Sequence, residues 1–218
     1  WLNRNSKAGS RRNIHAHYDL GNSFYSLWLD PSMTYSSAWF KSSDESLTQG
    51  QINKYNKIIS SIEVKSGDKI LEIGCGWGGL MEQAILQGIH VDGLTISQEQ
   101  FDYANKRISK IDDHHATGQP ILRDYRDHFG QYDGIASIEM FEAVGEQYWD
   151  SYFKTVRGIV QDGITGEYEN KQIDVNIFNA RMNNTFTATK NLRFQLFGML
   201  RGRDISLQGE RKAMYRAD

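Results

Sequence analysis

Short apolar runs alternate along the chain with longer segments of helical spacing. Four apolar runs have the length of buried strands, at 69–73, 90–96, 120–124 and 132–138. Segments with apolar residues at three- and four-residue spacings lie before and between these runs and after the last of them, at 43–64, 78–87, 97–110 and 146–160. Strands that alternate with helices predict a parallel sheet with right-handed crossovers, so we expect a doubly wound α/β fold up to about residue 160.

Helix boundaries are marked by residues that cap helices. Ser97 is a typical N-cap, and Gln100 three positions later completes a capping-box pattern. Gly88 is placed to close the helix at 78–87. The segment 43–64 predicts an amphipathic helix, with an apolar stripe of Ile52, Tyr55, Ile58, Ile59 and Ile62.

After residue 162 the period of the pattern changes to two. The runs 173–178 and 185–189 alternate, which predicts antiparallel half-buried strands, and Asn183 and Asn184 suit a turn between them. The stretch 192–200 mixes both periods and predicts neither element. We therefore expect three parts: a helical lead-in at 1–64, an α/β core at 65–162 and a β-rich tail of unknown role at 163–218.

Composition limits the function classes. The 218 residues are 39% hydrophobic and 24% charged, enough for one main core, and the net charge of -2 gives no general attraction to nucleic acid. The start is basic, and it is either a solvated arm or a contact with an anionic surface: Arg4, Lys7, Arg11, Arg12, His15 and His17.

No apolar run approaches the ~20 residues of a spanning helix, and no signal peptide opens the chain, so we expect a soluble or peripheral protein. Because the first residue is Trp1 rather than Met, we expect a piece of a longer protein.

A glycine loop follows the first strand, in the sequence Ile70-Leu-Glu-Ile-Gly-Cys-Gly-Trp-Gly-Gly79. Glycines let a backbone approach a ligand, and helix N-termini offer free N–H groups, so the loop predicts a nucleoside cofactor. It fits the dinucleotide fingerprint loosely, and polar residues at 95–100 occupy the place where that site requires an acid. The spacing Glu72-x-Gly74-x-Gly76, in a Rossmann-like core, is more similar to S-adenosylmethionine methyltransferases.

Cys75 is the only cysteine and lies inside the glycine loop. It excludes an intrachain disulfide and suits a reducing cytosol. Its place in the loop indicates packing rather than reactivity. The tail has no cluster of metal ligands, and we predict no metal site.

Six blocks of sequence form a distinctive series, and they are 11–22, 28–38, 71–79, 93–97, 124–127 and 137–145. Two of them read Trp28-Leu-Asp-Pro-Ser-Met-Thr-Tyr-Ser-Ser-Ala38 and Ser137-Ile-Glu-Met-Phe-Glu-Ala-Val-Gly145. In order and spacing the six blocks resemble the family of cyclopropane-fatty-acyl-phospholipid and mycolic acid cyclopropane synthases. The resemblance implies transfer of a methyl group from S-adenosylmethionine to a cis double bond of a phospholipid acyl chain, followed by closure of a cyclopropane ring. It also implies a cytoplasmic protein at the inner face of a membrane, with no nucleic-acid partner; a homodimer is an open alternative.

The resemblance also implies which residues contact the cofactor. Tyr35 and Ser36 would touch it from the lead-in, and Tyr125 and Arg126 would flank its adenine. The loop would hold the methionine end and the segment after the second strand the ribose: Glu72, Gly74, Cys75, Gly76, Trp77, Gly78, Thr95, Ile96, Ser97, Gln98, Glu99 and Gln100. The alternative without the family is that Tyr35 and Tyr125 are core aromatics, Asp124 is a strand-end cap and Arg126 is a solvated side chain.

Glu142 and Ser37 are the candidate catalytic residues. Ring closure needs a base, because the added methyl group must lose a proton. The resemblance implies a bound bicarbonate as that base, with Glu142 helping to hold it and the Ser37 backbone contacting it; the alternative is that Glu142 caps the next turn. The chain has Ser37 where the family has Cys, and no counterpart of the family's later His and Tyr partners of the anion.

Two other functions remain open. One is a methyltransferase that acts on a small soluble acceptor. The other is a cofactor-binding fragment, impaired in catalysis, whose tail has become an interaction module. Four phenylalanines of the tail are explained by core packing or by an acyl pocket: Phe178, Phe186, Phe194 and Phe197.

Overall fold

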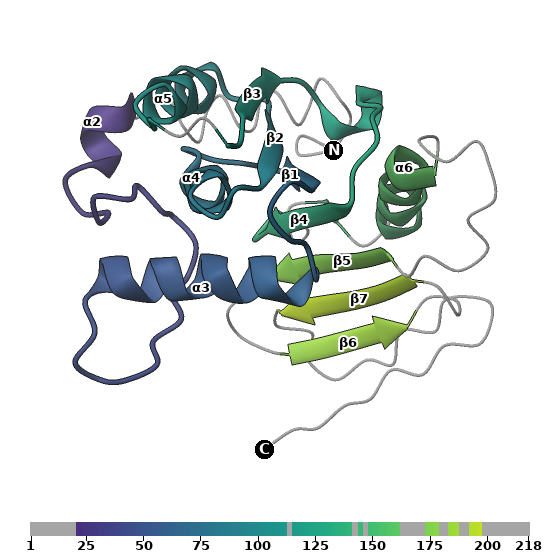
Figure 1. The fold of residues 1–218 in the computed structure, drawn as a ribbon, viewed down its shortest axis with the longest axis horizontal. Coiled ribbons are helices and arrows are strands. Elements are labelled where there is room, and N and C mark those ends of the chain that lie inside the picture. The colour runs from purple at the N-terminus through teal and green to yellow at the C-terminus, as the bar shows by residue number, and fades with distance from the viewer. Residues whose placement is uncertain are drawn as a thin grey trace.

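A seven-stranded sheet organises the chain (Figure 1). The computed structural model describes residues 21–112, 115–140, 144–145 and 148–161, and the backbone of 173–178, 183–187 and 192–197. In chain order the elements are α2 (Gly21–Tyr25), α3 (Leu47–Ser61), β1 (Lys69–Ile73), α4 (Gly79–Ile85), β2 (His90–Thr95), α5 (Gln98–Ile108), β3 (Gly118–Leu122), η1 (Tyr125–Asp127), β4 (Gly134–Ile138), α6 (Trp149–Gln161), β5 (Ile173–Phe178), β6 (Asn183–Thr187) and β7 (Leu192–Phe197). The strand order is β3-β2-β1-β4-β5-β7-β6.

The expected parallel α/β core is confirmed. Strands β2, β1 and β4 are neighbours and run parallel, and β3 pairs parallel with the outer side of β2. Pro120 lies in β3, which is an edge strand, where the missing N–H of proline does not interrupt the sheet.

Alternate residues of β1 feed two separate cores. Ile70 packs with α3 and α4 on one face, whereas Leu71 and Ile73 pack with α6 on the other. This is the period of two that a strand imposes on its side chains. The result is a sheet covered on both faces, with α3, α4 and α5 on one side and α6 on the other (Figure 1).

The helix caps agree only in part with the expected pattern. Ser97 is the N-cap of α5, and its Oγ accepts a hydrogen bond from the Gln100 N–H at 3.4 Å. The reciprocal half of the predicted capping box is absent, because the Ser97 N–H donates to Thr95 Oγ1 and the Gln100 Oε1 accepts from the same hydroxyl. Thr95, at the end of β2, therefore takes the role that Gln100 was expected to fill.

The prediction of an antiparallel pair in the tail was wrong. β5 pairs parallel with β4 on one side and with β7 on the other, so it continues the core sheet. The antiparallel pair is β6 with β7, and Asn183 and Asn184 begin β6 instead of forming a turn. Period-two alternation identifies a strand but carries no information about its partner, which is why the pairing was missed.

The parallel strands bring their carboxyl ends to one edge of the sheet. The loops after β1, β2, β3 and β4 are therefore neighbours, although they are spread from residue 74 to residue 140. Open α/β sheets bind ligands at this edge. Within the described part of the chain, no helix combines the length and the apolar character needed to cross a bilayer.

Candidate functional site

The glycine loop is tied to the neighbouring strand by its backbone. The N–H groups of Gly74 and Cys75 both donate to the Leu94 carbonyl of β2, at 2.9 and 2.8 Å. Gly74, Gly76 and Gly78 have positive φ angles of 83°, 53° and 82°. A Cβ at Gly76 would meet no atom within 4 Å, so the loop leaves open space beside its backbone. Such a loop can hold a ligand close to its peptide groups.

Glu72 is a buried acid at the end of β1. It is 2% exposed, and its Oε2 has no hydrogen-bond partner among the described residues. Burial raises the pKa of Glu72 to about 8, and the charge of Lys54 opposes that rise. An unsatisfied buried oxygen beside a glycine loop is available for a ligand that donates hydrogen bonds.

Asn22 joins the first two loops of the edge. The Trp77 Nε1–H donates to Asn22 Oδ1 at 2.6 Å, and the Asn22 amide donates to Glu99 Oε2 at 3.2 Å. The glycine loop and the start of α5 are thereby held by one side chain from α2. Asn22 was absent from the predicted site residues, although it ends the block 11–22.

Tyr35 reaches the glycine loop through one intermediate ring. It is 47% exposed, and its ring lies edge-on to the buried Tyr25, with 5.8 Å between centroids. Tyr25 in turn packs against Trp77 at 5.1 Å. The lead-in segment and the loop are therefore neighbours, and Tyr35 is not a core aromatic.

The end of β2 provides polar groups of two kinds. Thr95, Ser97 and Gln100 are buried and bonded to one another, so they form a rigid base. Gln98 and Glu99 are exposed and Ile96 is half-buried.

Asp124, Tyr125 and Arg126 form their own cluster after β3. Asp124 is 3% exposed, caps η1 by accepting from the Arg126 N–H, and forms an ion pair with the Arg126 guanidinium at 2.5 Å. These bonds raise the pKa of Arg126, so its charge is fixed. Tyr125 is half-buried, with its ring 5.3 Å from that of Tyr152. Asp124 is thus a strand-end cap, and Arg126 is not a freely solvated side chain.

Side chains from α3 hold the segment 35–37. The Lys54 Nζ donates to Ser36 Oγ at 2.5 Å, and the Gln51 amide donates to the Ser36 carbonyl at 2.8 Å. Neither residue was predicted to belong to the site. The signal was available, because Gln51 and Lys54 lie at helical spacing from Ile58 of the apolar stripe, so they face the core as polar residues.

The Ser37 N–H donates to Glu139 Oε1 at 2.9 Å, across the edge from the lead-in to the end of β4. Glu139 has a φ of 47°, a left-handed conformation that is uncommon for residues other than glycine. Glu139 is not among the predicted site residues. The other candidate acid, Glu142, lies outside the described residues, as do the basic start and residues 198–218.

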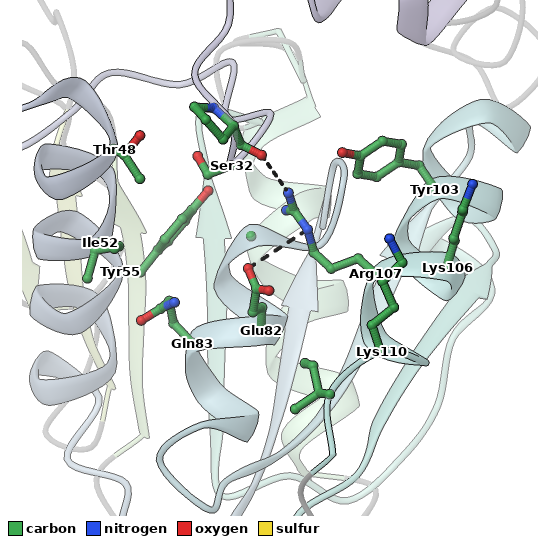
Figure 2. A pocket seen from close by; sticks show the side chains of 13 residues that line it. Ser32, Thr48, Ile52, Tyr55, Glu82, Gln83, Tyr103, Lys106, Arg107 and Lys110 are labelled. Atoms are coloured by element: carbon green, nitrogen blue, oxygen red, sulfur yellow. Dashed lines mark hydrogen bonds and ion pairs between the residues drawn. The ribbon is translucent and has the colours of Figure 1, made fainter.

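A cavity of about 570 Å³ opens between α3, α4 and α5, and it contains none of the predicted site residues (Figure 2). In it, Arg107 donates to the carbonyl oxygen of Pro31 at 3.4 Å and lies 3.8 Å from a carboxylate oxygen of Glu82. Arg107 also donates to the Trp77 carbonyl at 3.1 Å. Arg107 therefore links the lead-in and the glycine loop to α5.

Reactive sulfur and metal chemistry find no support in the described residues. Burial raises the pKa of the Cys75 thiol, so it stays protonated. In the ranges that the structure describes, no three His, Cys, Asp or Glu side chains gather in a way that could hold a metal ion.

A family model described as mycolic acid cyclopropane synthetase matches residues 5–197. The match extends the resemblance beyond residue 160 and includes all three later strands. Those strands carry no glycine loop or other distinctive spacing, so the sequence alone did not reveal their relationship.

Two curated relatives are similar over most of this chain. Tuberculostearic acid methyltransferase UfaA1 of Mycobacterium tuberculosis is 38% identical over 165 residues, which are 72% of this chain and 38% of the relative. Cyclopropane-fatty-acyl-phospholipid synthase of Escherichia coli (strain K12) is 42% identical over 150 residues, 68% of this chain and 38% of the relative. The chain therefore spans about two fifths of the length of these relatives.

Two solved structures share the fold. Mycolic acid cyclopropane synthase CmaA1 complexed with SAH and CTAB superposes with a TM-score of 0.66 at 30% identity, covering 69% of this chain and 53% of that chain. The cyclopropane synthase MmaA2 from Mycobacterium tuberculosis has the same TM-score and coverage at 33% identity.

Proposed function

Because this chain belongs to the mycolic acid cyclopropane synthetase family, we propose that it binds S-adenosylmethionine and methylates the cis double bond of an unsaturated phospholipid acyl chain, with closure of a cyclopropane ring. One observation carries the proposal. The lead-in, the glycine loop and the ends of β2 and β4 converge on one edge of the sheet, joined by Asn22 and by the bond from Ser37 to Glu139. The name of the Escherichia coli relative supports a phospholipid substrate.

The described residues fit a cofactor with a cationic amine and a nucleoside. The unsatisfied oxygen of Glu72 can accept from an ammonium group, and the open space at Gly76 gives room beside the backbone. The polar groups after β2 suit ribose hydroxyls, and the ring of Tyr125 suits a purine face. When bound, S-adenosylmethionine would supply a methyl group on a positively charged sulfur, where the π electrons of an alkene could attack the methyl carbon while the sulfur leaves as a neutral thioether.

The chain must then offer apolar surface to an acyl chain. Trp28 and Tyr35 are each about half exposed, and their ring centroids are 5.7 Å apart. Aromatic surface at this edge would bind an acyl chain. It would also exclude water, which would otherwise trap the carbocation that forms when a methyl group is added to the double bond. We propose that the chain works at the inner face of a membrane, with its basic start toward the lipid headgroups.

The described residues do not fit a bicarbonate ion. The Ser37 N–H, the expected backbone donor to that anion, already donates to the Glu139 carboxylate. β5 occupies the position beside β4 and contains no histidine. We therefore assign no proton transfer to bicarbonate. The catalytic role of Glu142 stays a prediction.

The test combines binding with product analysis. The full chain is titrated with S-adenosylmethionine, and then incubated with S-adenosylmethionine labelled in its methyl group and vesicles of dioleoyl phosphatidylglycerol. We expect a labelled cyclopropane acid in the recovered fatty acids and no product from vesicles whose chains are saturated. Binding without product would reduce the function to cofactor binding, and methylation of a soluble amine instead would replace the lipid acceptor.

A pair of glycines gives a matched control for the binding step. Gly76 and Gly67 both have positive φ and no atom within 4 Å of a built Cβ, but Gly67 lies in the turn before β1. Alanine is strained at both positions, and more so at Gly67, whose φ is 92°, than at Gly76, whose φ is 53°. Gly76→Ala should also fill the ligand space and weaken binding by about tenfold or more, as a clash of one methyl group with a bound ligand requires. Equal affinity in the two variants would contradict the placement of the cofactor.

A further inference from the structure

A buried lysine lies beneath the segment 35–37, and nothing in the proposed reaction uses it. Lys54 is on α3, is 0% exposed and donates to Ser36 Oγ. Moving an ammonium group out of water costs several kcal/mol unless hydrogen bonds and opposite charges compensate it. A hydrophobic residue of similar size would serve stability as well or better. Its presence here therefore points to a role other than stability.

Acids from three different elements surround this lysine. Glu72 on β1, Glu139 after β4 and Asp30 in the lead-in all favour its charged form, whereas burial is the larger effect and lowers the pKa of Lys54 to about 7. The ring centroid of Tyr55 lies 4.7 Å from the Nζ. Burial also raises the pKa of the Tyr55 hydroxyl, which stays neutral. Lys54 is thus the group of this cluster that links the lead-in, α3 and the ends of two strands.

The cluster is left incomplete by the described residues. Glu72 Oε2 and Gln51 Oε1 are buried without a hydrogen-bond partner in that part of the chain. A polar network that served only folding would satisfy these atoms, because each unsatisfied group costs about 1–3 kcal/mol. The hydrogen bonds that Gln51 and Lys54 donate converge on one residue, since they hold the carbonyl and the hydroxyl of Ser36.

We propose that Lys54 is a positioning residue, which together with Gln51 fixes Ser36 and so holds the segment 35–37 against the carboxyl edge of the sheet. Glu139 holds the same segment through the Ser37 N–H. The inference rests on the proposed function, since Tyr35 and Ser36 are predicted cofactor contacts. A charged lysine donates a stronger hydrogen bond than a neutral amine, so the hold should weaken as Lys54 loses its proton.

The first experiment measures position without any cofactor. Lys54→Met is compared with Lys57→Met, which changes an exposed lysine on the same helix. Amide hydrogen exchange of the ligand-free full chain should become about tenfold faster at 36–37 in Lys54→Met, as expected for loss of one charge-assisted hydrogen bond. Lys57→Met should leave the rate unchanged. Wild-type exchange at 36–37 in Lys54→Met overturns the positioning role, whether or not the chain binds S-adenosylmethionine.

The second experiment measures the consequence for the site. Titration with S-adenosylhomocysteine at about pH 6 and about pH 8.5 should give a wild-type affinity about fivefold weaker at the higher pH. Lys54→Met should bind about tenfold more weakly than wild type at about pH 6 and should lack the roughly fivefold loss towards about pH 8.5, so that any pH effect left in it comes from other groups such as Glu72. A wild-type chain that binds nothing overturns the proposed function. If Lys54→Met keeps the pH dependence of the wild type, only the positioning role of Lys54 is overturned.

Ser36→Ala tests the same hydrogen bond in case Lys54→Met does not fold. This variant removes the hydroxyl that accepts from Lys54 and leaves the buried lysine and α3 unchanged. It loses a predicted cofactor contact in any case, so its informative readout is the pH profile. Loss of the pH dependence in Ser36→Ala supports the inference, and an unchanged pH dependence overturns it.

Discussion

The carboxyl edge of the sheet has two halves, the loops after β1 and β2 and the loop after β4, and the two are built by different means. After β1 and β2 the groups that face the ligand space are backbone and short polar side chains, placed by loops that directly follow their strands. After β4 the contacts join segments far apart in sequence, as in the hydrogen bond from Ser37 to Glu139, which spans 102 residues. Long-range contacts such as that of Asn22 with Trp77 brace the first half as well, but its backbone groups are present whatever the side chains, whereas a single substitution at Glu139 removes the contact after β4. Cofactor binding can therefore persist in a chain whose acceptor half has diverged.

The largest expected effect is in the first half. Trp77→Ala removes an indole that is 3% exposed, packs with Tyr25 and bonds to Asn22. Truncation of such a side chain costs about 3–5 kcal/mol of unfolding free energy and should abolish binding of S-adenosylhomocysteine. Trp28→Ala is the control, because its side chain is half exposed, and we expect about 1 kcal/mol. Urea denaturation measures both, and equal losses would show that the glycine loop is not a packed unit.

A pH effect on stability should come from two buried groups of opposite charge, Glu72 and Lys54. Burial raises the pKa of Glu72 from 4.5 to about 8, so stability falls as pH rises from 4.5 towards 8. Burial lowers the pKa of Lys54 from 10.5 to about 7, so stability rises again between 7 and 10.5. Each limb has a slope of up to roughly 1.4 kcal/mol per pH unit, with a minimum between the two folded-state values.

The comparison protein for this pH effect is the double variant Lys54→Met with Glu72→Gln, which lacks both titrating groups. Urea midpoints measured across the pH range should give a difference curve with its lowest point between pH 7 and pH 8. A flat difference curve would mean that the two groups titrate normally in the folded chain.

The same contrast explains what could be predicted from sequence. Strands β1 to β4, the cap at Ser97 and the turn at Gly88 follow from local patterns, and the structure confirms them. The parallel pairing of β5 with β4 and β7 does not, because a strand pattern does not specify its partner.

The side chains that hold the site edge were harder to predict than its loops. Lys54 and Gln51 were visible as polar residues on an apolar helix face, but their target, Ser36, is fixed only by tertiary structure. Asn22 had no local signal of its bond to Trp77, which lies 55 residues away. Local patterns therefore predicted the loops at the carboxyl edge of the sheet, and missed the residues that brace them.

A smaller effect should follow from loss of the bridge between the first two loops. Asn22→Ala removes the acceptor of the Trp77 Nε1–H and the donor to Glu99. Loss of a hydrogen bond by a buried donor costs about 1–2 kcal/mol, and we expect a similar change in the binding free energy of S-adenosylhomocysteine. Asn56→Ala is the control, since Asn56 accepts an exposed hydrogen bond from Gln87. If both variants bind equally well, the bridge does not contribute to the site.

The smallest effect isolates the long-range contact of the second half. Glu63 and Glu139 both have left-handed φ angles, 55° and 47°, so glycine at either position relieves backbone strain of about 1 kcal/mol. Glu63 is exposed, and Glu63→Gly should stabilise the chain by several tenths of a kcal/mol after the entropic cost of glycine. Glu139→Gly gains the same relief but loses the acceptor of the Ser37 N–H, so its stability should stay close to wild type. The difference between the two changes in unfolding free energy measures what the hydrogen bond contributes. If the two variants are stabilised equally, the segment 35–37 is held from α3 alone.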